Sequence, residues 1–154
     1  MATAVADAGA LDMLATRFET ALVTLVPLLT TATRQTSGMP GISFLMPCLD
    51  RDAVIAASID RVVELFYADR DASLVAQIHE GAALAGWQVG SPDGAKAAFD
   101  AGCDIAVAQS FEAGDHGPWQ IRLLPLHEAV LSVVNLPVVA AGGTDRELFG
   151  DHRA

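Results

Sequence analysis

The sequence predicts an α/β fold built as an incomplete TIM-type (β/α) barrel, and three observations support this. Short apolar runs alternate with amphipathic helical segments, and no hairpin-type dipeptide joins two runs, so the strands should be parallel with helical crossovers. Polar residues follow several different runs, as in barrels whose sites are assembled from many strand ends. A complete barrel needs roughly 250 residues, whereas this chain has 154. The alternative, an open doubly wound sheet, usually carries a glycine-rich fingerprint after its first strand, and none is present.

Five segments carry the strand pattern directly. Each is short, largely apolar and bounded by turn-forming or polar residues, as buried parallel strands are. They are residues 42–46, 62–67, 84–89, 104–109 and 138–141.

Helix signals lie between these strands. Asp50 is predicted to cap the first helix, and Asp71 or Ser73 the second. The pair Ser91-Pro92 is a strong start for the third, because proline suits the first helical turn. A fourth helix is predicted from about residue 126 to 134. The apolar segment 21–29 is predicted to be a core helix or an association face.

Composition restricts the class of protein. A hydrophobic fraction of 52% and a charged fraction of 18% suit one core-rich domain over residues 1–154. The net charge of -10 argues against nucleic acid and anionic membrane as partners. Cys48 and Cys103 indicate neither a disulfide framework nor a metal site. With no signal-peptide pattern at the N-terminus, a cytoplasmic location is expected.

Two strand ends carry the candidate chemistry. The run 105–108 ends in a polar cluster, and ligands of α/β folds bind at that end of a strand. The cluster contains Gln109, Glu112, Gly114, Asp115 and His116. The run 138–141 ends in Gly142-Gly143, where backbone amides could approach a phosphate. One strand end therefore offers a candidate base, and the other a candidate anion cradle.

These segments resemble the FMN-dependent nitronate monooxygenases (2-nitropropane dioxygenases), whose flavin lies at the C-terminal face of a (β/α)8 barrel. Residues 108–116 are similar to the family's Ala-Gln-Gly-x-Glu-Ala-Gly-Gly-His, and residues 137–143 to its Pro-Val-x-Ala-Ala-Gly-Gly. Residues 41–47 and 86–91 also look like family segments, and residues 6–14 like the family's second strand. The resemblance therefore implies about six consecutive parallel strands.

The resemblance also implies a site. FMN would be the cofactor, and His116 the general base that takes the α-proton of a nitroalkane. Gln88 and Gln109 would hydrogen-bond the flavin ring or ribityl chain, or else satisfy backbone groups at strand ends. Gly142 and Gly143 would cradle the phosphate, or else form a tight turn. The remaining implied cofactor contacts are Ser43, where the family has asparagine, and Gly114 of the histidine motif; no metal is implied.

The sequence departs from the family pattern in ways that keep alternatives open. Ser110 and Asp115 replace motif glycines, and Gly117-Pro118 replaces a basic residue. The family's first strand, and its last with the Gly-Thr-Arg-Phe phosphate grip, fall outside residues 1–154, so the strands near 8–14 and 138–141 are expected to be open edges. Glu112 is a candidate for holding its loop through backbone amides.

The expected activity is oxidation of nitronates or nitroalkanes with dioxygen. The alternatives are a catalytically impaired homologue with a structural or interaction role, and a related flavin-dependent enoyl reductase-like protein. The open edges predict either self-association, through these edges and the apolar segment 21–29, or a marginally folded and aggregation-prone chain.

Overall fold

Within the residues that the structure describes, six parallel strands form one sheet. The computed structural model describes residues 12–15, 27, 31, 40–45, 50–59, 61–66, 69, 71–113 and 120–142. The strands are β1 (Asp12–Ala15), β2 (Pro40–Leu45), β3 (Val62–Phe66), β4 (Leu84–Val89), β5 (Ile105–Gln109) and β6 (Val138–Ala141). The helices are α3 (Arg51–Ala57), α4 (Ala72–Glu80), α5 (Pro92–Asp100) and α6 (Leu123–Leu131), with a 3-10 turn, η2 (Phe111–Ala113), after β5.

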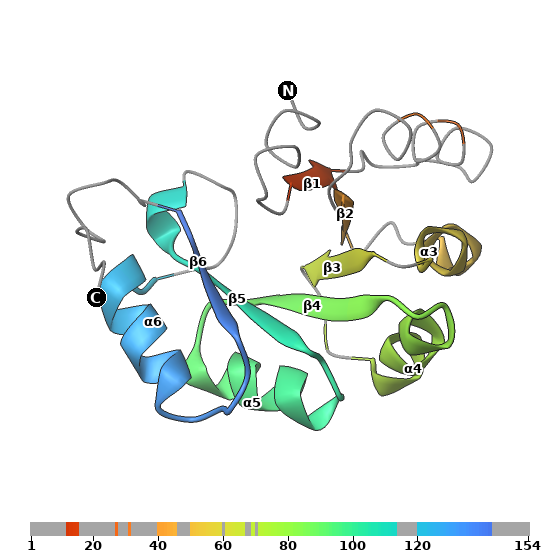
Figure 1. The fold of residues 1–154 in the computed structure, drawn as a ribbon. Helices are drawn as coiled ribbons and strands as arrows, with labels where there is room; N and C mark the ends of the chain where they lie inside the picture. The colour runs from red at the N-terminus through yellow and green to blue at the C-terminus, as the bar shows by residue number, and fades with distance from the viewer. Residues whose placement is uncertain are drawn as a thin grey trace, which may run out of the picture.

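The strands lie side by side in their order along the chain, from β1 to β6, and every neighbouring pair is parallel. A doubly wound sheet reverses its strand order at a switch point, so this order rules that alternative out. Figure 1 shows α3, α4, α5 and α6 arranged as an arc around the outside of the curved sheet. The predicted six-stranded partial barrel is therefore confirmed.

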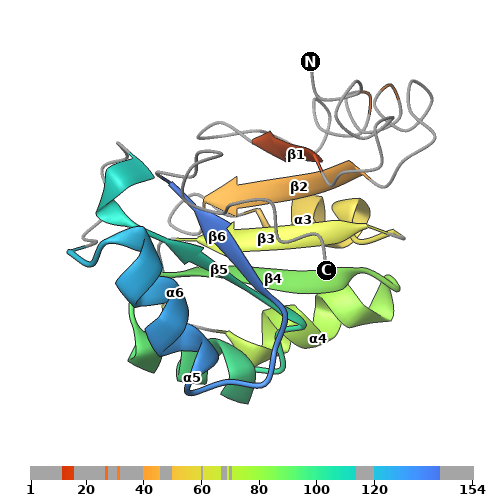
Figure 2. The same ribbon diagram turned by 60° about the vertical axis from the view of Figure 1, so that its left-hand side comes forward.

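The two faces of the sheet have different environments because successive side chains point to opposite faces of a strand. The side chains on the convex face are buried against the outer helices and form the main core, with Trp87 of β4 fully buried. Their members from the sheet include Ile42, Phe44, Val63, Leu65, Ala85, Trp87, Val89, Ala106 and Ala108. The alternate side chains of the strands, such as Glu64 and Val107, point to the concave face and line a cavity there. Figure 2 shows β6 in front of the middle strands, at an angle to them.

Three helices begin as their capping residues predict. The Asp50 carboxylate accepts the backbone N–H groups of Asp52 and Ala53. Asp71, and not Ser73, caps α4, and its carboxylate also accepts from Arg51 of α3. The Ser91 hydroxyl accepts the Gly94 N–H at 3.1 Å, with Pro92 in the first turn. Each cap satisfies N–H groups that have no partner within the helix.

The predicted bounds of α6, residues 126–134, are wrong, because the helix spans Leu123–Leu131. Pro125 lies in its first turn, where a missing N–H costs nothing. Arg122 provides no side-chain cap at the start, so the signal used for the other helices is absent. The strand predictions for residues 42–46, 62–67 and 104–109 also needed adjustment, to Pro40–Leu45, Val62–Phe66 and Ile105–Gln109.

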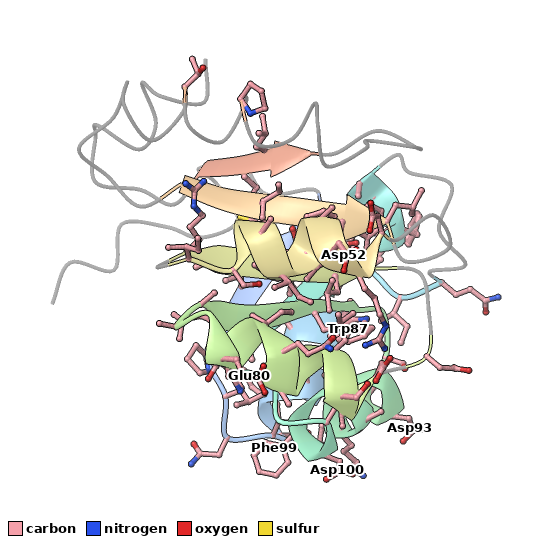
Figure 3. All side chains as sticks on the ribbon, turned by 90° about the vertical axis from the view of Figure 1, so that its right-hand side faces the viewer. Asp52, Glu80, Trp87, Asp93, Phe99 and Asp100 are labelled. Atoms are coloured by element: carbon pink, nitrogen blue, oxygen red, sulfur yellow. The ribbon has the colours of Figure 1, made fainter. Side chains whose placement is uncertain are left out.

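The outer surface of the helices is acidic. Figure 3 shows Asp52, Glu80, Asp93 and Asp100 on this side of the molecule, where all four are exposed. Among the described residues, no helix is long and apolar enough to cross a membrane. The predicted helix over residues 21–29 lies outside the described residues, apart from residue 27.

Candidate functional site

The carboxyl ends of β4, β5 and β6 bring three of the predicted site residues to one edge of the sheet. Gln88 of β4 lies opposite Val107 of β5, and Gln109 of β5 lies opposite Ala141 of β6. Gln109 is buried, and Gly142 directly follows the residue opposite it. Segments separated by about thirty residues in the sequence thus become neighbours.

Ser110 connects the two motif segments. Its side chain is fully buried, and its hydroxyl donates to the Gly142 carbonyl oxygen at 3.1 Å. The Ser110 hydroxyl oxygen in turn accepts the backbone N–H of Glu112 at 3.1 Å. The Ser110 N–H donates to the carbonyl of Ala141. The serine that departs from the family's glycine therefore holds the end of β5 against the end of β6.

Gly142 has a packing reason to be glycine. Its φ is +85°, a left-handed conformation that side chains disfavour. A Cβ there would lie 2.5 Å from the Ala113 Cβ, because the 3-10 turn packs directly against it. The close approach of Ala113 is sufficient to explain why position 142 is glycine, with no need to invoke a ligand. A phosphate contact at the Gly142 amide stays a prediction.

Glu112 holds its loop through a backbone amide, as one interpretation of the sequence proposed. Its Oε2 accepts the backbone N–H of Leu123 at 3.1 Å. That N–H belongs to the first turn of α6, where the amides have no helical partner and a carboxylate is favoured by the helix dipole. Glu112 therefore serves as the cap that Arg122 does not provide.

Ser43 and Gln88 contact a carboxylate that the sequence analysis did not single out, Glu64 of β3. The Gln88 Nε2 donates to Glu64 Oε1 at 2.9 Å, and the Ser43 side chain also hydrogen-bonds this carboxyl. Ser43 and Glu64 are directly opposite each other in the register of β2 and β3. The signal in the sequence was a single charged residue within an otherwise apolar strand.

The environment of Glu64 favours its neutral form. The residue is only 6% exposed. Burial raises the pKa of its carboxyl above the ordinary value of 4.5, although the hydrogen bonds from Gln88 and Ser43 partly oppose this. A buried carboxyl with a raised pKa in a concave site is a recognised mark of a functional position.

His116, Gly114 and Gly143 lie outside the described residues, so their predicted roles stay predictions. Of the other predicted site residues, the structure places Gln88, Gln109 and Gly142 together at the strand ends. Ser43 lies on β2, two residues before that strand ends, and its contact is with Glu64.

The side chains at these strand ends carry hydrogen-bonding groups of the kind that could hold FMN. Two carboxamides, Gln88 and Gln109, can both donate to and accept from the heteroatoms of a flavin ring. Directly after β4, β5 and β6, the described residues 90–91, 110–113 and 142 include no lysine or arginine, and Arg122 lies farther along, at the start of α6. A phosphate beside these strand ends would therefore depend on backbone amides of the described residues that directly follow the strands.

Sequential parallel strands, an outer layer of helices and polar residues at the carboxyl strand ends define a protein of the (β/α)-barrel class. A family model described as nitronate monooxygenase matches residues 46–148. The chain belongs to the nitronate monooxygenase family.

Two solved structures share the fold of this chain. Nitroalkane oxidase from Streptomyces ansochromogenes is 25% identical, with a TM-score of 0.79, over 93% of this chain and 54% of its own. FabK from Thermotoga maritima is 23% identical, with a TM-score of 0.83, over 93% of this chain and 46% of its own. This chain thus spans about half the length of these relatives.

A third structure shares the fold. Thiamine phosphate pyrophosphorylase from Pyrococcus furiosus is 19% identical, with a TM-score of 0.69, over 94% of this chain and 68% of its own. No match was found among curated protein sequences.

Proposed function

We propose that this protein is a flavin-dependent oxidoreductase of the nitronate monooxygenase type, which uses FMN to oxidise nitronates or nitroalkanes with dioxygen. The observation that carries the proposal is the family match over residues 46–148, which contains both hallmark segments. The ends of β5 and β6 that carry these segments are joined through Ser110 and Gly142. The solved relative named nitroalkane oxidase supports the substrate class.

Each proposed residue has a role that suits its chemistry. His116 is the general base that removes the α-proton of a neutral nitroalkane, because an imidazole titrates near neutral pH. Gln88 and Gln109 orient the flavin ring through their carboxamides, and Ser43 and Gly114 line the same site. The amides of Gly142 and Gly143 hold the phosphate. When bound, FMN supplies an electron acceptor for the substrate carbanion and a reductant for dioxygen.

The proposed site should bind the phosphate group of FMN only weakly. A site that depends on backbone amides lacks the charge-assisted hydrogen bonds of a basic side chain, which contribute about 1.5–3 kcal/mol each. The net charge of -10 further disfavours an anion. We therefore expect the affinity for FMN to be orders of magnitude lower than that of a site in which a basic side chain also binds the phosphate.

Titration with FMN tests the proposal. Purified protein should be yellow, or should quench the fluorescence of added FMN in a saturable manner. Gln109→Leu should weaken this binding, whereas Gln120→Leu, the same change at an exposed position, should not. A folded, colourless protein that leaves excess FMN fully fluorescent would contradict the proposal. That result would favour the alternative, a homologue with a structural or interaction role.

A further inference from the structure

A cavity lies on the concave face of the sheet, opposite to the helices. Its volume is about 300 Å³. Its described walls are apolar side chains contributed by β1, β3, β5 and β6, including Met13, Val62, Ile105, Val107 and Val139. Glu64 is the titratable group among the described residues that line it. The cavity thus combines an apolar wall with a single carboxyl, a combination that fits a small amphiphilic ligand.

The carboxyl of Glu64 is held in place from within the sheet. Gln88 Nε2 donates to its Oε1 at 2.9 Å, and Ser43 supplies a second hydrogen bond. Both partners are neutral. A carboxylate has about four acceptor positions, so these two contacts leave acceptor capacity for a ligand. When the Glu64 carboxyl is ionised, neither of these partners neutralises its negative charge.

We propose that the cavity binds a small primary alkylammonium ion, with its ammonium group on the Glu64 carboxylate and its alkyl chain along the apolar wall. A cation is favoured because an ionised carboxyl with two neutral partners has no counter-charge among the described lining residues. The net charge of -10 also concentrates cations around the protein. The volume is at the lower end of small-molecule sites, roughly 300–1,000 Å³, so the chain should be short.

Binding should be coupled to a proton. Burial favours the protonated Glu64 carboxyl, and an ammonium ion favours the carboxylate, so the cation displaces a proton where the free site is protonated. The described groups facing Glu64 from β2 and β4 are Ser43, Gln88 and Gly86, none of which is charged. The described lining residues from β1, β5 and β6 are apolar. The affinity for the ammonium ion should therefore rise as the pH rises through the pKa of Glu64.

Calorimetric titration of the full chain with n-butylammonium tests this proposal, with butan-1-ol as the uncharged probe of similar shape. We expect Glu64→Gln to weaken butylammonium binding by at least about tenfold, or about 1.4 kcal/mol. It should leave butanol binding unchanged. The matched control is Glu80→Gln, which removes the same net charge at an exposed position on α4 and should leave both affinities unchanged. Equal butylammonium affinity in wild type and Glu64→Gln would overturn the proposal.

Two further measurements do not depend on the stability of Glu64→Gln. In wild-type protein near the pKa of Glu64, the measured heat should vary with the ionisation enthalpy of the buffer, because binding releases a proton. Gly86→Val narrows the cavity beside Glu64 and should weaken the binding of both probes. The position admits a side chain, because a Cβ at Gly86 would lie 3.8 Å from its nearest contact, the Val63 carbonyl oxygen. Wild-type protein with a cooperative melt that binds no butylammonium, or binds it without proton release, would show that the cavity is not an ammonium site. Because these titrations use no flavin, their failure is distinct from failure of the proposed oxidoreductase function.

Discussion

The hydroxyl of Ser110 donates a hydrogen bond to the carbonyl oxygen of Gly142 across 3.1 Å. The two residues are 32 positions apart in the sequence and belong to the two segments that carry the family hallmarks. Ser110 is fully buried, and its oxygen also accepts the Glu112 N–H, which holds the 3-10 turn in place. The position of the segment that contains Gly142 therefore depends on the segment that contains Ser110.

Replacing Ser110 with alanine should lower the free energy of unfolding by about 1–3 kcal/mol, because it removes both hydrogen bonds of a fully buried hydroxyl, one to the Gly142 carbonyl and one from the Glu112 N–H. Chemical denaturation measures this. Ser132→Ala is the control, since it removes a hydroxyl that donates to the Ala129 carbonyl at an exposed position. The interpretation fails if both variants lose the same stability.

Replacing Gly142 with alanine should cost about 1–3 kcal/mol, because its φ of +85° and the nearby Ala113 both resist a Cβ. Gly86→Ala should cost less, because a Cβ there would lie 3.8 Å from its nearest contact, the Val63 carbonyl oxygen. Adding Ala113→Gly to Gly142→Ala should restore part of the stability by removing the steric conflict. A thermal melt of the four proteins checks this, and an absence of any rescue would show that strain in the backbone alone is responsible.

The proposed base can be tested by separating two substrates. His116→Ala should abolish turnover of neutral nitroalkanes and spare preformed nitronates, because only the neutral substrate must lose a proton. Asp115→Gly restores the family residue and should raise activity by removing a negative charge beside the histidine and the anionic product of deprotonation. Oxygen consumption measures both. Equal loss on both substrates in His116→Ala would exclude the assignment as base.

Glu64 should make the protein less stable as the pH rises. Its pKa in the folded state is raised, chiefly by burial, so the folded protein binds this proton more tightly than the unfolded chain does. The stability from the protonated carboxyl is complete below its ordinary pKa of 4.5 and is lost as the pH rises through the folded-state value. Denaturation at a series of pH values should show this loss in wild type and a smaller one in Glu64→Gln.

Asp71 acts in a different pH range. Its pKa is lowered, first by the hydroxyl of Ser73, so its contribution is lost as the pH falls below its ordinary value of 3.8. The two effects therefore do not overlap. Identical pH profiles above 4.5 for wild type and Glu64→Gln would contradict the account of Glu64.

The sheet edges predict self-association. In the described part of the chain, β1 and β6 each pair with one strand only, and Val139 in β6 is 46% exposed. Unpaired strand edges attract other chains, and lysine on an edge opposes this. Val139→Lys should shift the protein toward monomer in sedimentation velocity. Leu84→Lys, at 44% exposure on the interior strand β4, is the control. A wild-type protein that is a compact monomer at micromolar concentration would refute the prediction.

Features that depend on residues close together in the sequence could be predicted before the fold was known. Apolar runs placed β4 and β6 at their observed bounds, and Asp50, Asp71 and Ser91 marked three helix starts, because a cap and its amides are two or three residues apart. The segments 108–116 and 137–143 also carried the resemblance to the family, which the family match confirmed. These signals are local, so they survive without any knowledge of the fold.

Contacts between residues far apart in the sequence became known from the three-dimensional fold. The start of α6 was misplaced because its cap, Glu112, is 11 residues away from the amide it accepts and across a loop. The contact between Gln88 and Glu64 joins positions 24 apart, and it exists because the register of parallel strands brings the same face of β3 and β4 together. A hydrophobic pattern fixes which face of a strand is buried, but it carries no information on which strand lies alongside it or at what register.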